Sequence, residues 1–501
     1  MRLPFVFTVL LMPGLSNSAY AVDYTWSGPT AGTVDWNDHL NWGSGGVGAY
    51  PKNQDDVANL TLANTGLLTI NLNVAITVGT LNTGNTAGDT SATILAANGG
   101  SLTFDVSADD AQWTHSPTGD ATFDIDAPVF LDDSIAIYNN RTNFGGRQLI
   151  GGDITAASAG AKTIKWLGQE GVAGGGQPYI RIGGDISDGP GQLAVSSQSV
   201  IAGQGPGLYL DSSNNTYTGI TEAIAAGSAD LIVSTSGSLG STVSGTVIGG
   251  GAGNNVLWLR ATVIGEALTL SGNGWTGGAL FAERNVTTWG GPITLVGDAR
   301  IATSNYLNSD LTIDVDAGNA IAGDFNLNFT TGAVGHPIQV NDPIATGPGG
   351  LTKAGEGTLF LNAVNTYTGD TNVDGGTIDL GSSGGLRFEI GASGVNNKIL
   401  GDGTIDLDGV LTFDLSGAGT SLGDTWQIVD TSGGLTANYS AGFSVTGFSA
   451  SGGVWTLGSG AYEFDESTGV LSVVGVVIPE PGTLVLLAMG GIGLIFQRRR
   501  K

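Results

Sequence analysis

Residues 349–380 read GGLTKAGEGTLFLNAVNTYTGDTNVDGGTIDL, and they contain the pattern that decides the fold. Short apolar and β-branched runs such as TLFL alternate with glycine and asparagine, as strands alternate with tight turns. Parts of the pattern return elsewhere: NTYTG occurs at 215–219 and 365–369, and GGDI at 151–154 and 183–186. Recurring units of this kind indicate a repeat protein, in which each unit stacks on its neighbours.

The rest of the chain up to about Val477 shows the same alternation of short strand-like runs with turn residues. Other short strand-like runs, bounded by Gly, Asn, Asp or Ser, are 67–70, 75–78, 102–104, 268–270, 293–295 and 311–313. No segment shows the 3.6-residue apolar period of an amphipathic helix, so the sequence predicts an all-β protein. The chain has 85 glycines in 501 residues, which we expect to supply the positive φ angles of the corners.

The quoted stretch resembles the autotransporter-associated β-strand repeat, whose pattern is close to GGLTKxGxGTLxLxxxNTYTGxTxVxGGTL. The match is nearly complete over 349–380 and partial over 205–221. The resemblance implies a right-handed parallel β-helix over residues 22–385, in which each coil stacks its strands on those of the coil before. With coils of roughly 20–25 residues, the structure would be a long rod.

Both ends of the predicted β-helix have the signature of a cap, which would protect the unpaired strand edges of a terminal coil. Residues 386–477 hold more aromatic and more cleanly alternating strands, which predicts terminal β-coils or a small β-sandwich cap. Near the other end, Trp26, Trp36 and Trp42 are close in sequence. They favour an aromatic cap on the first coil; the alternative is a carbohydrate platform, because sugar faces stack on indole rings.

Residues 1–21 have the layout of a secretory signal peptide. Arg2 precedes an apolar run, and a small-residue cleavage site follows at Ala19 and Ala21. We therefore expect signal peptidase as a processing partner, and export of the chain. The absence of cysteine fits an exported bacterial protein and excludes disulfides, Cys-ligated metals and thiol catalysis.

Residues 478–501 combine three features in a fixed order: Pro479-Glu480-Pro481, an apolar stretch, and a basic end. The basic end, which predicts a cytoplasmic tail, contains Arg498, Arg499 and Arg500. This order resembles the PEP-CTERM sorting signal. The resemblance implies a transmembrane helix, transient anchoring in the inner membrane and processing by an exosortase.

The net charge of the chain argues against some classes of binding partner and favours others. It has 44 acidic side chains against 17 Lys and Arg, a formal net charge of −27. Both predicted processing signals are basic, so their removal would leave a still more acidic protein. Such a surface argues against a nucleic-acid partner, which needs a basic face, and could attract cations or basic partners.

No constellation of catalytic residues stands out, and we expect neither an active site nor a cofactor. Asp402, Asp406 and Asp408, in GDGTIDLD, faintly resemble one calcium-binding nonapeptide repeat, which makes them weak calcium candidates. We expect acidic pairs in general to lie on a solvated face. The histidines, which are too scattered for a metal site or a catalytic triad and are expected at the surface or in loops, are His39, His115 and His336.

These features predict a non-enzymatic, exported surface or matrix protein, either adhesin-like or associated with exopolysaccharide and biofilm, as the sorting-signal resemblance implies. Exopolysaccharide is then the expected external partner, and the membrane is a partner through the C-terminal helix before processing. Two alternatives stay open. One is a β-helical polysaccharide lyase or glycoside hydrolase, and the other is a calcium-dependent carbohydrate-binding surface protein.

Overall fold

The computed structural model describes residues 21–43, 48–86, 91–118, 121–140, 147–168, 179–198, 207–250, 253–274, 277–305 and 308–475. Within these ranges the chain is β-structure apart from two short 3-10 helices, η1 (His39–Asn41) and η2 (Thr431–Gly433). The all-β prediction is confirmed. None of the helices in the described part is long and apolar enough to cross a membrane.

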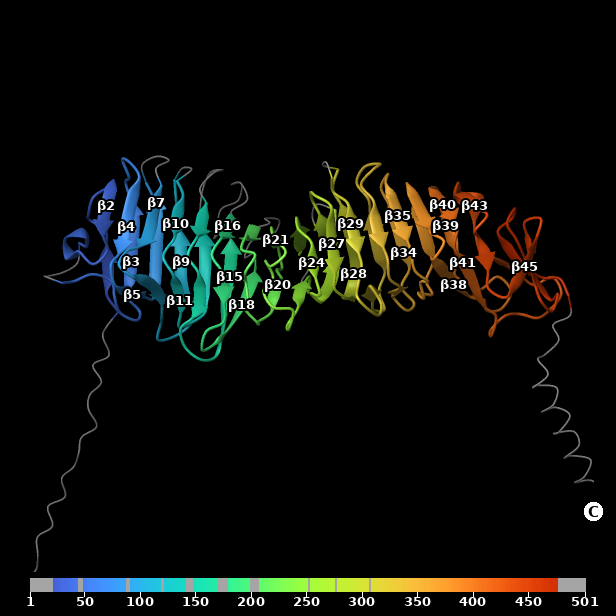
Figure 1. The fold of residues 1–501 in the computed structure, drawn as a ribbon, viewed down its shortest axis with the longest axis horizontal. Coiled ribbons are helices and arrows are strands. Elements are labelled where there is room, and N and C mark those ends of the chain that lie inside the picture. Colours follow the sequence, from blue (N-terminus) through green and yellow to red (C-terminus); the bar gives the residue numbers. More distant parts are fainter. Residues whose placement is uncertain are drawn as a thin grey trace, which may run out of the picture.

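The strands stack side by side into an elongated rod that runs from the N-terminal coils to the C-terminal coils (Figure 1). Each coil contributes strands to up to three faces, and the strands of one face pair in parallel with those of the next coil. In the quoted stretch, β34 (Leu351–Ala354) pairs with β36 (Thr371–Asp374), and β35 (Thr358–Leu361) pairs with β37 (Thr377–Leu380). The parallel β-helix prediction is therefore confirmed.

Two of the faces form one 27-stranded sheet, because the long strand β28 (Ile293–Thr303) belongs to both. The remaining strands of the first face are β1 (Asp23–Thr25), β3 (Val57–Leu62), β6 (Thr80–Asn85), β9 (Ala111–His115), β12 (Ile135–Asn139), β15 (Ala161–Gly168), β18 (Gln192–Ser197), β20 (Thr221–Ala223), β22 (Thr246–Ile248), β25 (Leu268–Gly272), β30 (Ile321–Ala322) and β33 (Ile344–Ala345). Those of the second face, besides β34 and β36, are β2 (Gly32–Asp35), β4 (Leu68–Leu72), β7 (Ala92–Ala96), β10 (Phe123–Ile125), β13 (Gln148–Ile150), β16 (Tyr179–Ile182), β19 (Gly207–Leu210), β21 (Asp230–Val233), β23 (Val256–Leu259), β26 (Leu280–Ala282), β31 (Leu327–Thr330) and β39 (Ile399–Gly401).

The third face is split into two parallel sheets. The first contains β5 (Ala75–Val78), β8 (Ser101–Phe104), β11 (Val129–Leu131), β14 (Ile154–Ala156) and β17 (Ile186–Ser187). The second contains, besides β35 and β37, β24 (Val263–Ile264), β27 (Thr287–Gly290), β29 (Leu311–Ile313), β32 (Ile338–Val340), β40 (Thr404–Leu407) and β43 (Thr436–Tyr439).

The coils vary more in length than predicted. Leu351 pairs with Thr371, 20 residues later, whereas Thr80 pairs with Gln112, 32 residues later. The prediction of 20–25 residues per coil is therefore too narrow. Strand register fixes only the stacked segments, so the corners between them can lengthen without disturbing the ladder.

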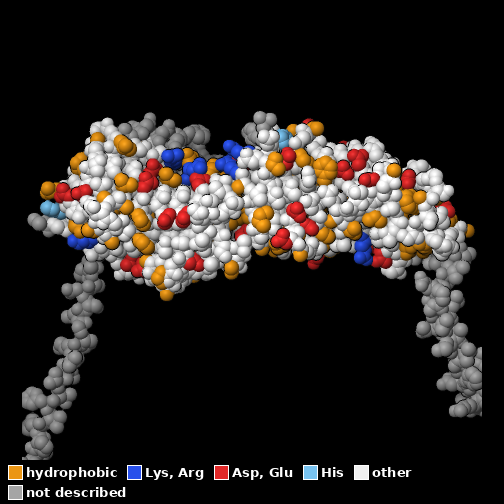
Figure 2. All heavy atoms as spheres, in the orientation of Figure 1, with side chains coloured by type: hydrophobic (Ala, Val, Ile, Leu, Met, Phe, Trp, Pro, Cys, Tyr) orange, Lys and Arg blue, Asp and Glu red, His pale blue; other side chains and the backbone are white. Residues whose placement is uncertain are grey.

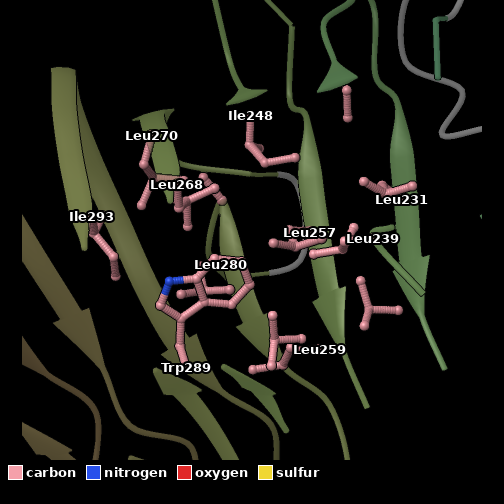
Figure 3. Packing of buried hydrophobic residues seen from close by; sticks show 14 of the residues in the cluster. Leu231, Leu239, Ile248, Leu257, Leu259, Leu268, Leu270, Leu280, Trp289 and Ile293 are labelled. Carbon is pink, nitrogen blue, oxygen red and sulfur yellow. The ribbon is translucent and has the colours of Figure 1, made fainter. Parts of the chain in front are cut away.

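Successive side chains of a strand point to opposite sides of the sheet, so every second side chain points into the interior of the rod. On the second face, isoleucines stack directly in register from coil to coil, as Ile70, Ile94, Ile125, Ile150 and Ile182. Strands of different faces send side chains such as Leu257, Leu280 and Trp289 into the same interior (Figure 3). The buried cluster is continuous from Tyr24 to Val473, so the core extends along the whole rod.

The repeated NTYTG motif has one structural role at both of its positions. The Asn365 Oδ1 accepts a hydrogen bond from the Ile344 N–H of the preceding coil (3.0 Å), and its Nδ2 donates to the Gly385 carbonyl of the following coil (3.1 Å). Asn215 in the other copy makes the same two bonds at 2.8 Å each, with Ile186 and Ser238. A single buried side chain thus ties three coils together at a corner, where backbone groups need partners.

The lysine of the quoted stretch lies inside the rod. Lys353 is fully buried, and its Nζ donates to the carbonyls of Ala354 and Gly355 (2.9 Å each) and of Gly375 (3.2 Å). Burial lowers the pKa of Lys353 to about 8, because the charged form loses its hydration. The ammonium donates to carbonyls at a glycine-rich corner, of which that of Ala354 also accepts from the Thr331 N–H of the preceding coil (3.0 Å).

Glycine has a second role besides the one predicted. Gly376 has a φ of +61°, as expected for a corner, but Gly152 and Gly184 of the two GGDI copies do not have positive φ. A Cβ at Gly184 would overlap the carbonyl oxygen of Gly152, and a Cβ at Gly152 would overlap that of Ala127. At these corners glycine is required because the backbones of successive coils lie in contact.

The prediction that all three histidines are surface or loop residues is wrong for His115. This residue ends β9 and is buried, with its Nδ1 3.0 Å from the Thr83 hydroxyl of the preceding coil. Burial lowers the pKa of His115 to about 4, so the ring is neutral at neutral pH. A neutral imidazole with a hydroxyl partner can occupy a core position, which scattered placement in the sequence does not reveal.

The C-terminal end of the rod changes from parallel to antiparallel pairing. A last parallel sheet contains β38 (Gly385–Glu389), β41 (Val410–Asp414) and β44 (Ser444–Val445). It is followed by an antiparallel sheet of β42 (Thr425–Gln427), β45 (Phe448–Ser451), β46 (Val454–Leu457), β47 (Tyr462–Asp465) and β48 (Val470–Val473). Phe443 packs against Trp455 and Phe464 between them, so aromatic side chains close the end of the core.

Candidate functional site

The three N-terminal tryptophans are core residues. Trp42 packs against Trp36 (ring centroids 4.9 Å apart) and Trp26 (5.1 Å), and all three rings are at most 8% exposed. The Trp36 indole N–H donates to the Pro51 carbonyl (2.9 Å). A carbohydrate platform needs an open ring face, which these buried rings do not offer. The geometry is that of the favoured interpretation, an aromatic cap.

The three weak calcium candidates do not converge. Asp402 is exposed ahead of β40, the Asp406 carboxylate accepts from the Asn438 amide (2.7 Å), and the Asp408 carboxylate from the Ser440 hydroxyl. Within the residues that the structure describes, no group of three His, Asp or Glu side chains could hold a metal ion. The acidic side chains that show on the surface in Figure 2 are distributed along the rod.

Of the predicted processing residues, the described ranges contain Ala21. Ala21 is exposed at the start of the described chain. The other residues assigned to the signal peptide and the sorting signal lie outside the described ranges; they are Ala19, Pro479, Glu480, Pro481, Arg498, Arg499 and Arg500.

A different feature, an apolar stripe on the outer side of the second face, is the strongest candidate for a site. Its residues face away from the interior and lie in register from β16 to β31. They are Arg181, Tyr209, Ile232, Trp258, Phe281, Ala302 and Thr330. Because paired parallel strands are about 4.8 Å apart, these side chains form a continuous row along the rod.

The sequence carries a signal for this stripe that the strand predictions did not use. The runs Val256–Leu259 and Leu280–Ala282 are apolar at every position, whereas most strands alternate apolar and polar residues. Leu257, Leu259 and Leu280 fill the interior. The intervening apolar residues must then point outward, where Val256, Phe281 and Ala302 form a second buried cluster with Trp258 packed against it.

The stripe opens into a cavity of about 670 Å³, which we call the hollow. Its described lining residues are Trp258, Gly277, Phe281, Glu283, Ala302, Thr303, Ser304, Asn305, Thr330, Thr331, Gly332 and Gly355. The Trp258 and Phe281 rings meet edge to face with centroids 5.0 Å apart. Beyond them the row continues with the small side chains of Ala302 and Thr330, and this drop in size leaves the space.

The one charged side chain in this lining, Glu283, is held by two arginines. Its carboxylate accepts from the Arg260 Nε on one oxygen and from the Arg284 Nη2 on the other (2.8 Å), and the side chain is only 8% exposed. The Arg260 guanidinium also lies over the Tyr209 ring, 5.2 Å from its centroid. Charge-assisted hydrogen bonds of this kind fix the wall of the hollow, and the three groups together carry one net positive charge.

Comparison with known proteins agrees with both sequence resemblances. Residues 351–380 match the Passenger-associated-transport-repeat family, and residues 477–501 match the PEP-CTERM protein-sorting motif. The chain is 28% identical over 386 residues to a protein of Brucella suis biovar 1 (strain 1330) named Adhesin BmaC autotransporter. No solved structure matches the chain.

The relative is far longer than this protein. The match covers 69% of this chain but 10% of the relative, so the two are similar over one part of a much larger molecule. The sorting motif and the similarity to the adhesin indicate an exported cell-surface protein. The chain carries a passenger-associated transport repeat within its β-rod and a PEP-CTERM protein-sorting motif at its C-terminal end.

Proposed function

We propose that this protein is a surface adhesin, a rigid rod that is sorted by an exosortase and then contacts extracellular material along its length. One observation carries the proposal: a repeat of the passenger type and a sorting motif occur in a chain whose described part forms one β-rod with a continuous core. The name of the Brucella relative, an adhesin, supports the same function.

The rod suits adhesion for a physical reason. A core that is continuous from Tyr24 to Val473 keeps the outer faces in fixed positions relative to one another. Weak contacts that repeat along such a face act together, because once one contact forms the next is effectively intramolecular. We propose exopolysaccharide as the material contacted and biofilm as the setting, by similarity to other proteins with this sorting signal.

The runner-up, a polysaccharide-degrading enzyme, finds less support in the hollow. Glycoside hydrolysis generally uses two carboxylates that flank the scissile bond. The described lining of the hollow contains a single carboxylate, Glu283, and each of its oxygens is engaged by a guanidinium. Adhesion does not require a pair of catalytic carboxylates, so an adhesive role agrees with this geometry.

Removal of the sorting signal tests the proposal. Deletion of residues 479–501 should abolish surface display, because the exosortase would have no motif to recognise. Alanine substitution of Pro479, Glu480 and Pro481 should leave unprocessed protein in the membrane fraction, since the apolar stretch and the basic end are kept. Cell fractionation and immunoblotting of the wild-type and altered chains measure both outcomes. Display of the deleted chain at the wild-type level would contradict the sorting step.

A further inference from the structure

We propose that the hollow binds sugar units of an uncharged polysaccharide, with the partly exposed Trp258 ring as its apolar floor and Phe281 as the buried ring that supports it. This inference rests on the proposed adhesive function and names its class of ligand. The hollow lies on the outer side of the second face, across β23, β26, β28 and β31, at positions that the strand register fixes. A ligand there would contact the rod without entering its core.

The floor has the chemistry that a sugar ring requires. A pyranose ring presents a face of C–H groups, which packs on the face or edge of an aromatic ring, and Trp258 is partly exposed at the end of the hollow. Phe281, its neighbour in the outward row, is buried and holds the indole edge to face at 87°. The volume of about 670 Å³ lies within the usual range of ligand pockets, roughly 300–1,000 Å³.

The rim carries neutral hydrogen-bonding groups. Hydroxyl and amide side chains of Thr303, Ser304, Asn305, Thr330 and Thr331 line the hollow. Thr303 is fixed in place, since its hydroxyl donates to the His336 carbonyl (3.0 Å) and accepts from the Gly332 N–H (3.1 Å). Apolar rings with neutral donors and acceptors around them suit a ligand that has both C–H faces and hydroxyl groups.

The overall charge of the chain favours an uncharged polymer over an anionic one. Beside the hollow, Glu283 is shared by Arg260 and Arg284, which leaves only one net positive charge at this wall. The chain as a whole carries a formal charge of −27, which repels polyanions at long range. Binding that depends on stacking and neutral hydrogen bonds should also change little with salt.

Two variants test the site in complementary ways. Trp258→Ala removes the ring, whereas Thr330→Phe keeps every aromatic group and fills the hollow. Thr93→Phe is the matched control, because Thr93 occupies the same outward row on β7, far from the hollow. Thermal unfolding of each purified protein identifies any variant that fails to fold.

Affinity electrophoresis in gels that contain hydroxyethyl cellulose, xylan or dextran, with alginate as the anionic probe, measures binding. We expect retardation by at least one neutral polymer, undiminished by 0.5 M NaCl, and weakened about tenfold or more in Trp258→Ala and Thr330→Phe but not in Thr93→Phe. Three results would overturn the proposal: no retardation by any neutral polymer, binding to alginate alone, or equal loss in the control.

A cell assay separates this inference from the proposed function. Cells that display Thr330→Phe at the wild-type level are tested for adhesion to a surface coated with the polymer that binds in the gel. Reduced adhesion supports both proposals. Undiminished adhesion, with binding lost in the gel, would overturn the hollow as the adhesive site and leave the adhesin proposal standing.

Discussion

Replacement of Trp36 by alanine is expected to cost about 3–5 kcal/mol of local stability, the usual range for a buried tryptophan. The ring is fully buried against Trp42, and its N–H donates to the Pro51 carbonyl. Because each coil contacts only its neighbours, the loss should be confined to the first coils. Hydrogen exchange should show protection lowered more than a hundredfold in β1–β4 and unchanged in β34–β41.

Two further variants make the Trp36 result specific. Trp36→Phe keeps most of the buried ring but loses the hydrogen bond to Pro51, so its effect should be smaller. Leu40→Ala should have no measurable effect, because Leu40 is 73% exposed. A uniform loss of protection along the whole rod, or none in the first coils, would contradict a terminal aromatic cap.

Replacement of Asn365 by alanine is expected to destabilise the rod locally by about 1–3 kcal/mol. Its side chain satisfies the Ile344 N–H and the carbonyls of Ala363 and Gly385. Alanine would leave the buried Ile344 N–H without its partner, at roughly 1–3 kcal/mol, whereas the Gly385 and Ala363 carbonyls still accept backbone N–H bonds from Asn365 and Gly385. Urea-dependent hydrogen exchange should show weakened protection in the coils on both sides of the corner, which contain β33 and β38.

The other copy and a surface asparagine supply the comparison for Asn365. Asn215→Ala should have a similar effect at its own corner, since it makes the same two bonds between coils. Asn362→Ala should cost well below 1 kcal/mol, because its side chain makes one partly exposed bond, to Asn341 (2.9 Å). If Asn365→Ala were as mild as Asn362→Ala, the motif would not be the connection between coils that the geometry indicates.

Much of the fold could be predicted because its physical cause is local. Short β-branched runs separated by glycine and asparagine predict strands and corners, and the resemblance of residues 349–380 to a known repeat predicts their parallel stacking. The structure explains two particular residues of that repeat. Lys353 donates hydrogen bonds to corner carbonyls, and Asn365 joins three coils.

The remaining features depend on register, which composition does not carry. The lining of the hollow comes from several coils, and Trp258 meets Phe281 only because β23 pairs with β26 in one particular alignment. The number of residues per coil varies along the rod. The alignment of β23 with β26 could therefore not be obtained by counting residues along the sequence. The N-terminal tryptophans are compatible with a cap and, as the alternative, with a sugar platform, because a sequence does not give ring exposure. The aromatic rings of the outer stripe lie within apolar runs that predict buried strands equally well.

Adhesion of intact cells tests the central claim most directly. A strain that lacks the protein is compared with the same strain producing the full chain, both on a surface coated with extracellular polysaccharide. If the chain is a surface adhesin, the producing cells adhere more strongly, and protease added to intact cells removes both the protein and the extra adhesion. Equal adhesion of the two strains, with the protein shown to be accessible at the surface, would contradict the account.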